Sequence, residues 1–184
     1  MKKRLTALLL ALMMVLGMLP SMASAASSEE AALGEVNIYN GGDELSYLSI
    51  NGAVQKFLYT YYPRVSPNGQ VKEIPAYCVN PNLYGVPQTV PKGESIRYNA
   101  AEKATDPKVM GIVANGYPTR DLPELGLENK EQAYYATKAA LWCYIIPGWN
   151  INNLKVNPSL SGAEKKRAEK ILAAAKDIYQ RGTM

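Results

Sequence analysis

Short runs of apolar and aromatic residues recur through the first half of the chain, and they predict β-strands. The runs are residues 34–39 (GEVNIY), 47–50 (YLSI) and 53–62 (AVQKFLYTYY), and an Asn-Gly pair at 51–52 separates the last two. Asn-Gly favours a tight hairpin because a type I′ turn needs positive φ at both central positions. We therefore expect an N-terminal β-hairpin.

A further strand is expected within residues 71–80 (VKEIPAYCVN), after a loop at 63–69. Pro75 lies in this run, and because proline cannot donate to a sheet ladder it favours an edge strand or a strand start. Repeated proline and glycine over the next 20 residues predict an extended surface loop. Helical character is then expected to begin near Asn99.

The second half of the chain carries start and stop signals for helices. Asp106, which a proline follows, predicts a helix that ends at the Asn-Gly pair at 115–116. Asn129 predicts the start of the next helix, with Gln132 as a variant of the capping box. That helix is expected to end before the Pro-Gly pair at 147–148.

The last predicted helix begins at Ser161, with Glu164 completing a capping box, and Gly182 is a natural residue to follow its end. One face of this helix is an apolar stripe, formed by Ala168, Ile171, Leu172, Ala175, Ile178 and Tyr179. Strands therefore lead and helices follow. We predict an α+β fold, with a strand-rich subdomain that carries the N-terminal hairpin and a helical subdomain.

Residues 1–25 have the pattern of a secretory signal peptide. A basic start is followed by an apolar run from Leu5 to about Leu19 and by Ala-Ser-Ala at 23–25, so we expect cleavage after Ala25. A retained membrane anchor is the alternative, but the run is shorter than the ~20 residues that a span needs. Residues 26–33 are expected to be a disordered leader, and residues 34–184 a single module. We also expect that the sequence is a fragment of a longer surface protein.

The charge balance changes once the signal peptide is removed. Segment 1–25 holds three of the 20 basic residues and none of the 16 acidic ones, so the formal charge falls from +4 to +1. This balance gives no support for a nucleic-acid partner, and we expect no membrane insertion after signal cleavage. The chain has no histidine, which excludes Ser-His-Asp and Cys-His nucleophile pairs and any metal site that needs histidine. We expect no cofactor and no metal.

One lysine stands out within the apolar segment QAYYATKAALWCYII at residues 132–146. Lys138 is flanked, three and four residues away on either side, by two tyrosines, a leucine and a tryptophan, so it lacks the polar stripe of a solvated helix face. It could still lie at the helix edge, extend its amine to water and pack its stem on tyrosines. The alternative is a functional lysine.

Four separate motifs, in order, resemble the thioester domain of Gram-positive surface proteins and pilus-tip adhesins. They are IPAYCVNPN at 74–82, ANGYPT at 114–119, EQAYYATKAALW at 131–142 and KDIYQRG at 176–182, so the resemblance covers roughly residues 34–182. The resemblance implies a secreted protein of the cell surface or cell wall that acts in host attachment. Its partners would be a host or matrix surface protein or a glycan, and further domains of the same surface protein.

In that family, a strand cysteine in an aromatic-Cys context is joined to the glutamine of a Thr-Gln-x-Ala-aliphatic-Trp helix. The resulting internal thioester can acylate a lysine amine on a host protein. By the resemblance, Cys78 is the cysteine and Lys138 stands in place of the glutamine. The supporting motif positions are Tyr77, Thr137, Ala140, Leu141 and Trp142.

The replacement of glutamine by lysine removes the chemistry of the thioester. A thiolate must attack a carboxamide carbon and displace ammonia, whereas Lys138 supplies only an amine. Gln132 points about 120° away from position 138 on a helix, so it is a poor substitute. Gln88, in the predicted loop, cannot be placed from sequence.

Several states of Cys78 remain open at this point. It could form a thiolate–ammonium pair with Lys138, an oxidative nitrogen–sulfur link to that lysine, or an unreactive buried thiol. A Cys78–Cys143 disulfide is a further alternative, since an exported chain with two cysteines can pair them. Position 143 lies about 7.5 Å along the helix from 138 and about 140° round it, so Cys78 should not face both.

We therefore expect an adhesin-type domain that lacks the thioester and binds noncovalently or has a structural role. A second hypothesis is a noncovalent carbohydrate-binding or peptide-binding module with a tyrosine-rich surface, because the chain has 13 tyrosines and one phenylalanine. We do not expect an enzyme. Glu124 and Glu128 could form an acid–base pair, but nothing in their surroundings singles them out.

Overall fold

The computed structural model describes residues 35–79, 85–99 and 106–184. The predicted signal peptide and leader, at residues 1–33, lie outside the described residues, as does part of the predicted loop. Residues Gly34–Met184 group into one unit, in which sheet and helices share a hydrophobic core. The predicted α+β class is confirmed. Among the described helices, none is both long and apolar enough to cross a bilayer.

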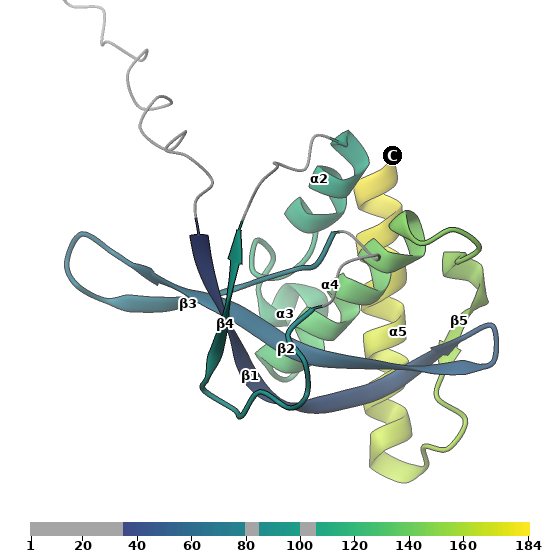
Figure 1. Cartoon of the computed structure of the whole chain (residues 1–184). Helices are drawn as coiled ribbons and strands as arrows, with labels where there is room; N and C mark the ends of the chain where they lie inside the picture. Colours follow the sequence, from purple (N-terminus) through teal and green to yellow (C-terminus); the bar gives the residue numbers. More distant parts are fainter. Residues whose placement is uncertain (1–34, 80–84, 100–105) are drawn as a thin grey trace, which may run out of the picture. The chain divides into compact units, whose positions relative to one another are not determined.

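An antiparallel sheet forms one layer of this unit (Figure 1). The strand order is β3-β2-β1-β4, and β5 pairs with the end of β1. The bounds are β1 (Glu35–Ile50), β2 (Ala53–Val65), β3 (Val71–Pro75), β4 (Ser95–Asn99) and β5 (Leu154–Val156). Thus β4 and β5, which are far apart in sequence, both pair with β1.

The predicted hairpin joins β1 to β2. Asn51 and Gly52 have φ values of 49° and 83°, so both central turn positions are positive, as the Asn-Gly pair predicted. β1 is one strand where the sequence predicted two, and its pairing with β2 is irregular between Asn40 and Glu44. In this irregular stretch Gly41 packs on the Tyr59 ring, which a Cβ would overlap. β1 therefore continues through residues 40–46, which the sequence predicted as a break between two strands.

Two predictions in the next segment are wrong. β4 occupies the end of the predicted loop and the predicted helical start near Asn99, because its five residues pair with Glu35–Tyr39 of β1. Such pairing between distant segments leaves no local signal. The prediction that Pro75 marks an edge strand or a strand start is confirmed, because β3 is an edge strand and Pro75 is its last residue. Cys78 therefore lies beyond the strand, in a segment without regular structure.

The helices begin where the cap residues predicted. Asp106 accepts hydrogen bonds from the backbone N–H groups of Lys108 and Val109, and Asn129 accepts one from Gln132. The Gln132 side chain accepts from the Glu128 backbone N–H, so the reciprocal capping bond to Asn129 is replaced. The bounds are α2 (Pro107–Ala114), α3 (Leu122–Leu125), α4 (Lys130–Ile145), η1 (Ile151–Asn153) and α5 (Gly162–Thr183).

Two predictions for α5 are corrected. Ser161 makes no side-chain cap hydrogen bond within the described part of the chain, and Glu164 instead pairs with Arg167. Gly182 lies inside α5, not beyond its end. A Cβ at Gly182 would overlap the backbone of Ile112, so this glycine lets α5 approach α2 closely.

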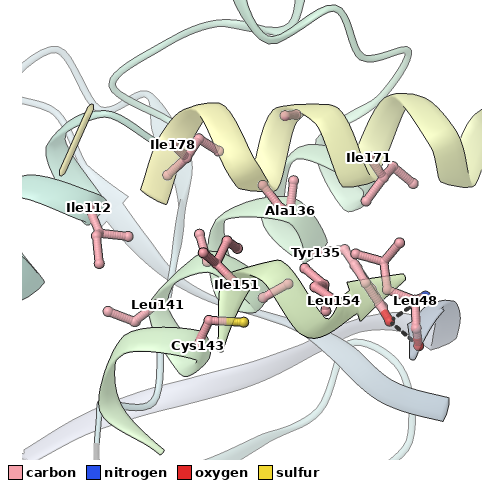
Figure 2. Packing of buried hydrophobic residues seen from close by; sticks show 14 of the residues in the cluster. Leu48, Ile112, Tyr135, Ala136, Leu141, Cys143, Ile151, Leu154, Ile171 and Ile178 are labelled. Atoms are coloured by element: carbon pink, nitrogen blue, oxygen red, sulfur yellow. Dashed lines mark hydrogen bonds between the residues drawn. The ribbon is translucent and has the colours of Figure 1, made fainter. Parts of the chain in front are cut away.

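Helix α4 is the centre of the core. It contacts α5, α2, α3, η1 and β2, and residues 132–141 are all buried. Figure 2 shows Tyr135 reaching Leu48 of β1: its hydroxyl accepts from the Leu48 N–H at 3.0 Å. The same hydroxyl donates to the Gln55 carbonyl at 2.7 Å. Tyr135 thus pins α4 to both strands of the hairpin.

Candidate functional site

Cys78 and Lys138 line the same cavity, which has a volume of about 340 Å³. Cys78 comes from the segment after β3, and Lys138 from the middle of α4. The remaining walls come from β1, β2, β4 and the segment after residue 84, and they include Val36, Ile38, Leu58, Val86, Gln88 and Tyr98. Gly85 and Gln88 are exposed, so the cavity reaches the surface on that side.

The Lys138 side chain lies in a cage of three aromatic rings, formed by Phe57, Tyr134 and Trp142. Its Nζ atom is 4.9 Å from the Phe57 ring centroid, 5.0 Å from Trp142 and 5.6 Å from Tyr134. These distances are within the range at which a ring face attracts a cation. Lys138 is only 9% exposed, so it does not extend its amine to bulk water as the surface alternative requires.

The aromatic cage is the main described partner of this ammonium. Within the described residues, Lys138 has no ion pair and no hydrogen-bond acceptor. Glu44 lies on the cavity wall, but its carboxylate pairs with Lys56 at 3.0 Å. A charge buried without an opposite charge is costly, and the three rings offset part of that cost.

Helix α4 also holds the Cys78 segment in place. The Trp142 indole N–H donates to the Cys78 carbonyl at 3.1 Å, and the Tyr134 hydroxyl donates to the Ala76 carbonyl at 3.1 Å. The Tyr77 ring stacks on the Tyr134 ring, with centroids 4.9 Å apart and planes 12° apart. The aromatic residues of the cage therefore also position the backbone that carries the thiol.

Thr137 connects a third segment to the site. Its hydroxyl donates to the Ala133 carbonyl at 2.8 Å and accepts from the Tyr117 N–H at 3.0 Å. The Tyr77 hydroxyl donates to the Tyr117 carbonyl at 2.6 Å, and burial raises the Tyr77 pKa well above its usual value. A Cβ at Gly116 would overlap the Thr137 side chain. The loop at 114–119 is thus fastened to both α4 and the Cys78 segment.

The motif residues that this arrangement brings together also match a known family sequence pattern. The thioester domain pattern matches residues 75–183, which include the Cys78 segment, the loop at 114–119 and all of α4. The chain belongs to the thioester domain family.

Two solved structures share the fold of this thioester domain. The thioester domain of the Enterococcus faecium TIE86 protein has a TM-score of 0.53 and 19% sequence identity, with 82% of this chain and 52% of that chain covered. The Bacillus anthracis TIE protein has a TM-score of 0.51 and 20% identity, with 81% of this chain and 24% of that chain covered. The chain thus spans about half and about a quarter of these two relatives. A search of curated proteins found no match.

The resemblance predicts that Lys138 of this thioester domain stands in place of the motif glutamine, and Gln132 and Gln88 are the two glutamines that could replace it. Gln132 is 2% exposed and its carboxamide oxygen accepts from the Glu128 N–H at 3.1 Å, so it serves the start of α4. Gln88 lines the cavity with Cys78, which sequence analysis could not establish. Among the described lining residues, Gln88 is the only carboxamide, although it belongs to a different element from the motif glutamine.

Other residues of the predicted motif have structural roles in this thioester domain. Ala140 and Leu141 are fully buried in the core. Cys143 is 3% exposed among the core residues shown in Figure 2, and burial raises the pKa of its thiol to about 12. Neither of the two described cysteines is in a disulfide, so the Cys78–Cys143 alternative is not formed.

Sequence analysis missed Phe57 and Tyr98 as site residues. Phe57 is on β2 and supplies one ring of the cage, and Tyr98 is on β4 and lines the cavity. Burial raises the pKa of Tyr98, and the neighbouring Cys78 raises it further. Both residues reach the site through sheet pairing, and no local motif marks them.

The two glutamates weighed as an acid–base pair have other roles. Glu124 and Asp121 form a reciprocal cap of α3. Glu128 pairs with Arg167 at 3.3 Å and with Lys170 at 3.1 Å, and the Lys170 hydrogen bond lowers its pKa. Neither glutamate lines the described walls of the cavity. The described residues also contain no group of three or more potential metal ligands.

Proposed function

We propose that this thioester-family domain is an adhesin-type module of the bacterial surface that attaches noncovalently, without an internal thioester. The observation that carries the proposal is Lys138 in its aromatic cage, at the helix position that should supply the acyl carbon. A thioester needs a carbonyl carbon for the Cys78 thiolate to attack, and a lysine side chain has none. The cage further favours a cation at this position over a neutral carboxamide.

The family and the leading segment support a surface location. Residues 1–25 have a signal-peptide pattern, and the domain belongs to a family found in Gram-positive surface proteins. The partner would be a host or matrix surface protein or a glycan, and the domain would act as an attachment module and not as an enzyme. Further domains of the same protein would complete the surface structure, as expected for a chain that spans part of its relatives.

A second candidate is a carbohydrate-binding module, and the tyrosines of the sheet favour it. Tyr39 and Tyr61 stack with ring centroids 5.4 Å apart, and Tyr61 and Tyr59 stack at 5.9 Å. Tyr39 and Tyr61 are half-buried, so part of each ring faces solvent. Flat ring faces with a polar tip suit contact with sugar rings.

Intact mass spectrometry tests the proposal. Formation of a thioester would remove one ammonia molecule, and incubation with methylamine would then add one methylamine. We expect the purified protein to show neither change. Loss of ammonia would overturn the proposal, and a Gln88→Glu variant would then show whether Gln88 supplies the carbonyl, because glutamate cannot lose ammonia.

Glycan and matrix-protein binding separates the two candidates. Noncovalent binding by either should survive Cys78→Ala, because neither uses the thiol. Substitution of the half-buried ring stack, by Tyr39→Ala together with Tyr61→Ala, should abolish glycan binding if the second candidate is right. Unchanged glycan binding in that double variant would count against the tyrosine surface.

A further inference from the structure

Two primary amines, those of Lys138 and Lys56, and the Cys78 thiol line one small cavity, and its remaining walls are mostly apolar. The Lys56 amine is held in an ion pair with Glu44 at 3.0 Å. Lys138 is more than nine-tenths buried and lines this cavity together with Cys78. The apolar walls come from β1, β2 and the segment after residue 84: Val36, Ile38, Leu58 and Val86. Gly85 and Gln88 are exposed at the surface end. A ligand that enters would meet an apolar wall and two nucleophiles.

We propose that this cavity captures a small apolar aldehyde through Lys138, with Cys78 as the second nucleophile. The proposal rests on the proposed absence of the thioester, because Cys78 must keep its thiol. In an internal thioester the protein supplies the electrophilic carbon. In this proposal the ligand supplies that carbon and the protein supplies the nucleophiles. Two features of the cavity select the ligand: its walls select an apolar chain, and its amine selects a carbonyl group.

The reaction balances without an added oxidant or reductant. The Lys138 ammonium gives one proton to water, and its neutral amine adds to the aldehyde RCHO. Return of that proton and loss of one water then give the iminium R–CH=NH⁺–Lys. The Cys78 thiol then adds to the iminium carbon: its sulfur forms the new C–S bond, and its proton goes to nitrogen. The product is the N,S-acetal R–CH(S–Cys)–NH₂⁺–Lys, with the same charge as the starting ammonium.

The aromatic cage suits each charged species in this sequence. The ammonium, the iminium and the N,S-acetal all carry one positive charge on the nitrogen that the Phe57, Tyr134 and Trp142 rings surround. The attraction between a ring face and a cation therefore acts on the starting ammonium, the iminium and the product, and it is absent only in the neutral amine that attacks the aldehyde. Since the described residues place no carboxylate against Lys138, this attraction is not in competition with an ion pair.

Reductive trapping tests the proposal on the unmodified protein. The protein is incubated with limiting hexanal and sodium cyanoborohydride, which delivers hydride to the iminium carbon and leaves a stable hexyl amine. Peptide mapping then compares Lys138 with Lys56, which also lines the cavity, and with the exposed Lys108 and Lys165. We expect hexylation of Lys138 first. Labelling of Lys138 no faster than that of Lys165 would overturn the proposal.

Chain length gives a second readout that needs no variant. Each methylene buried in the cavity should strengthen capture by at most about fourfold, so hexanal should label Lys138 faster than propanal. Lys108 and Lys165 should show no such dependence, because their surroundings are solvent. Equal labelling of Lys138 by both aldehydes would show that the apolar walls do not bind the chain, and the proposal would fail.

Variants assign the roles of the two nucleophiles. Lys138→Arg keeps a cation in the cage but removes the amine, and it should lose the fast adduct, whereas the matched variant Lys165→Arg should retain it. Cys78→Ser should still give the reduced Lys138 adduct but should release unreduced hexanal faster than the wild type. Failure of this inference is a missing aldehyde adduct, whereas failure of the proposed function is a loss of ammonia before any aldehyde is added.

Discussion

The indole N–H of Trp142 donates a hydrogen bond to the carbonyl oxygen of Cys78 at 3.1 Å, so the helix that carries Lys138 also holds the thiol segment. The Trp142 ring meanwhile lies 5.0 Å from the Lys138 ammonium. One side chain thus connects the two residues at the centre of the site. Its two contacts can be separated by mutation, because one uses the N–H group and the other uses the ring face.

Trp142→Phe keeps a ring in the cage and removes the hydrogen bond to Cys78. A neutral hydrogen bond contributes about 0.5–1.5 kcal/mol, so we expect the free energy of unfolding in urea to fall by about this amount. The Cys78 thiol should also react faster with a disulfide reagent, because its segment is held less firmly. Trp149→Phe is the matched control, since the Trp149 ring contacts Trp142 but its substitution spares the Cys78 bond. Equal effects of the two substitutions would contradict this role.

Lys138→Gln should restore the acyl partner of the thioester motif. If position 138 faces Cys78 as the shared cavity indicates, the variant should lose one ammonia molecule and take up methylamine. Intact mass spectrometry measures both changes. The double variant Lys138→Gln/Cys78→Ala is the control and should show neither change. If the folded Lys138→Gln variant also showed neither change, position 138 would not face the Cys78 thiol.

The cation–π contact between Lys138 and Phe57 can be measured by a double-mutant cycle. Lys138→Met keeps the length of the side chain without its charge, and Phe57→Leu removes one ring from the cage. We expect a coupling free energy of about 0.5–2 kcal/mol from urea unfolding of the wild type, the two single variants and the double variant. A parallel cycle of Phe57→Leu with Lys108→Met should be additive, because Lys108 is exposed on α2. If the first cycle were also additive, Lys138 and Phe57 would have no coupling free energy, and the cation–π contact would be contradicted.

Cys143 should make stability depend on alkaline pH. Its pKa is raised to about 12 in the folded protein by burial, whereas an unfolded cysteine titrates near ~8.5. A folded pKa above the unfolded value gives stability that is fully present below pH ~8.5 and is lost as pH rises towards the folded pKa. The loss should be at most about 1.4 kcal/mol per pH unit in this window.

Cys143→Ala removes this titration and is the test. The variant will be less stable at pH 7, because a core side chain is shortened. The difference in the free energy of unfolding between wild type and variant should shrink as pH rises from 8.5 to 10. The informative result is the change of this difference with pH, since other groups titrate equally in both proteins. A difference that is constant over this range would contradict a buried neutral thiol.

Sequence analysis succeeded where a signal is local. The Asn51-Gly52 turn, the Asp106 and Asn129 caps and the buried segment at 132–146 each depend on residues within a few positions of one another. Lys138 could also be singled out from local sequence, because helical spacing identifies its neighbours on α4.

Features that depend on distant segments could not be predicted. Phe57 reaches the cage only because β2 passes beside α4, and β4 forms only by pairing with β1. Gly182 was read as a helix stop, although its role is to let α2 approach α5. In each of these cases the deciding partner is more than 40 residues away, so composition and spacing carry no information about it.

The contacts that hold the Cys78 segment have an evolutionary consequence. They are made by the side chains of Thr60, Tyr134 and Trp142, and none of them uses the Lys138 amine. The lysine codons AAA and AAG differ from the glutamine codons CAA and CAG by one nucleotide. If Lys138→Gln restores the thioester, one base change is enough for a lineage with this scaffold to gain or lose an electrophilic bond, while the framework around the thiol stays in place.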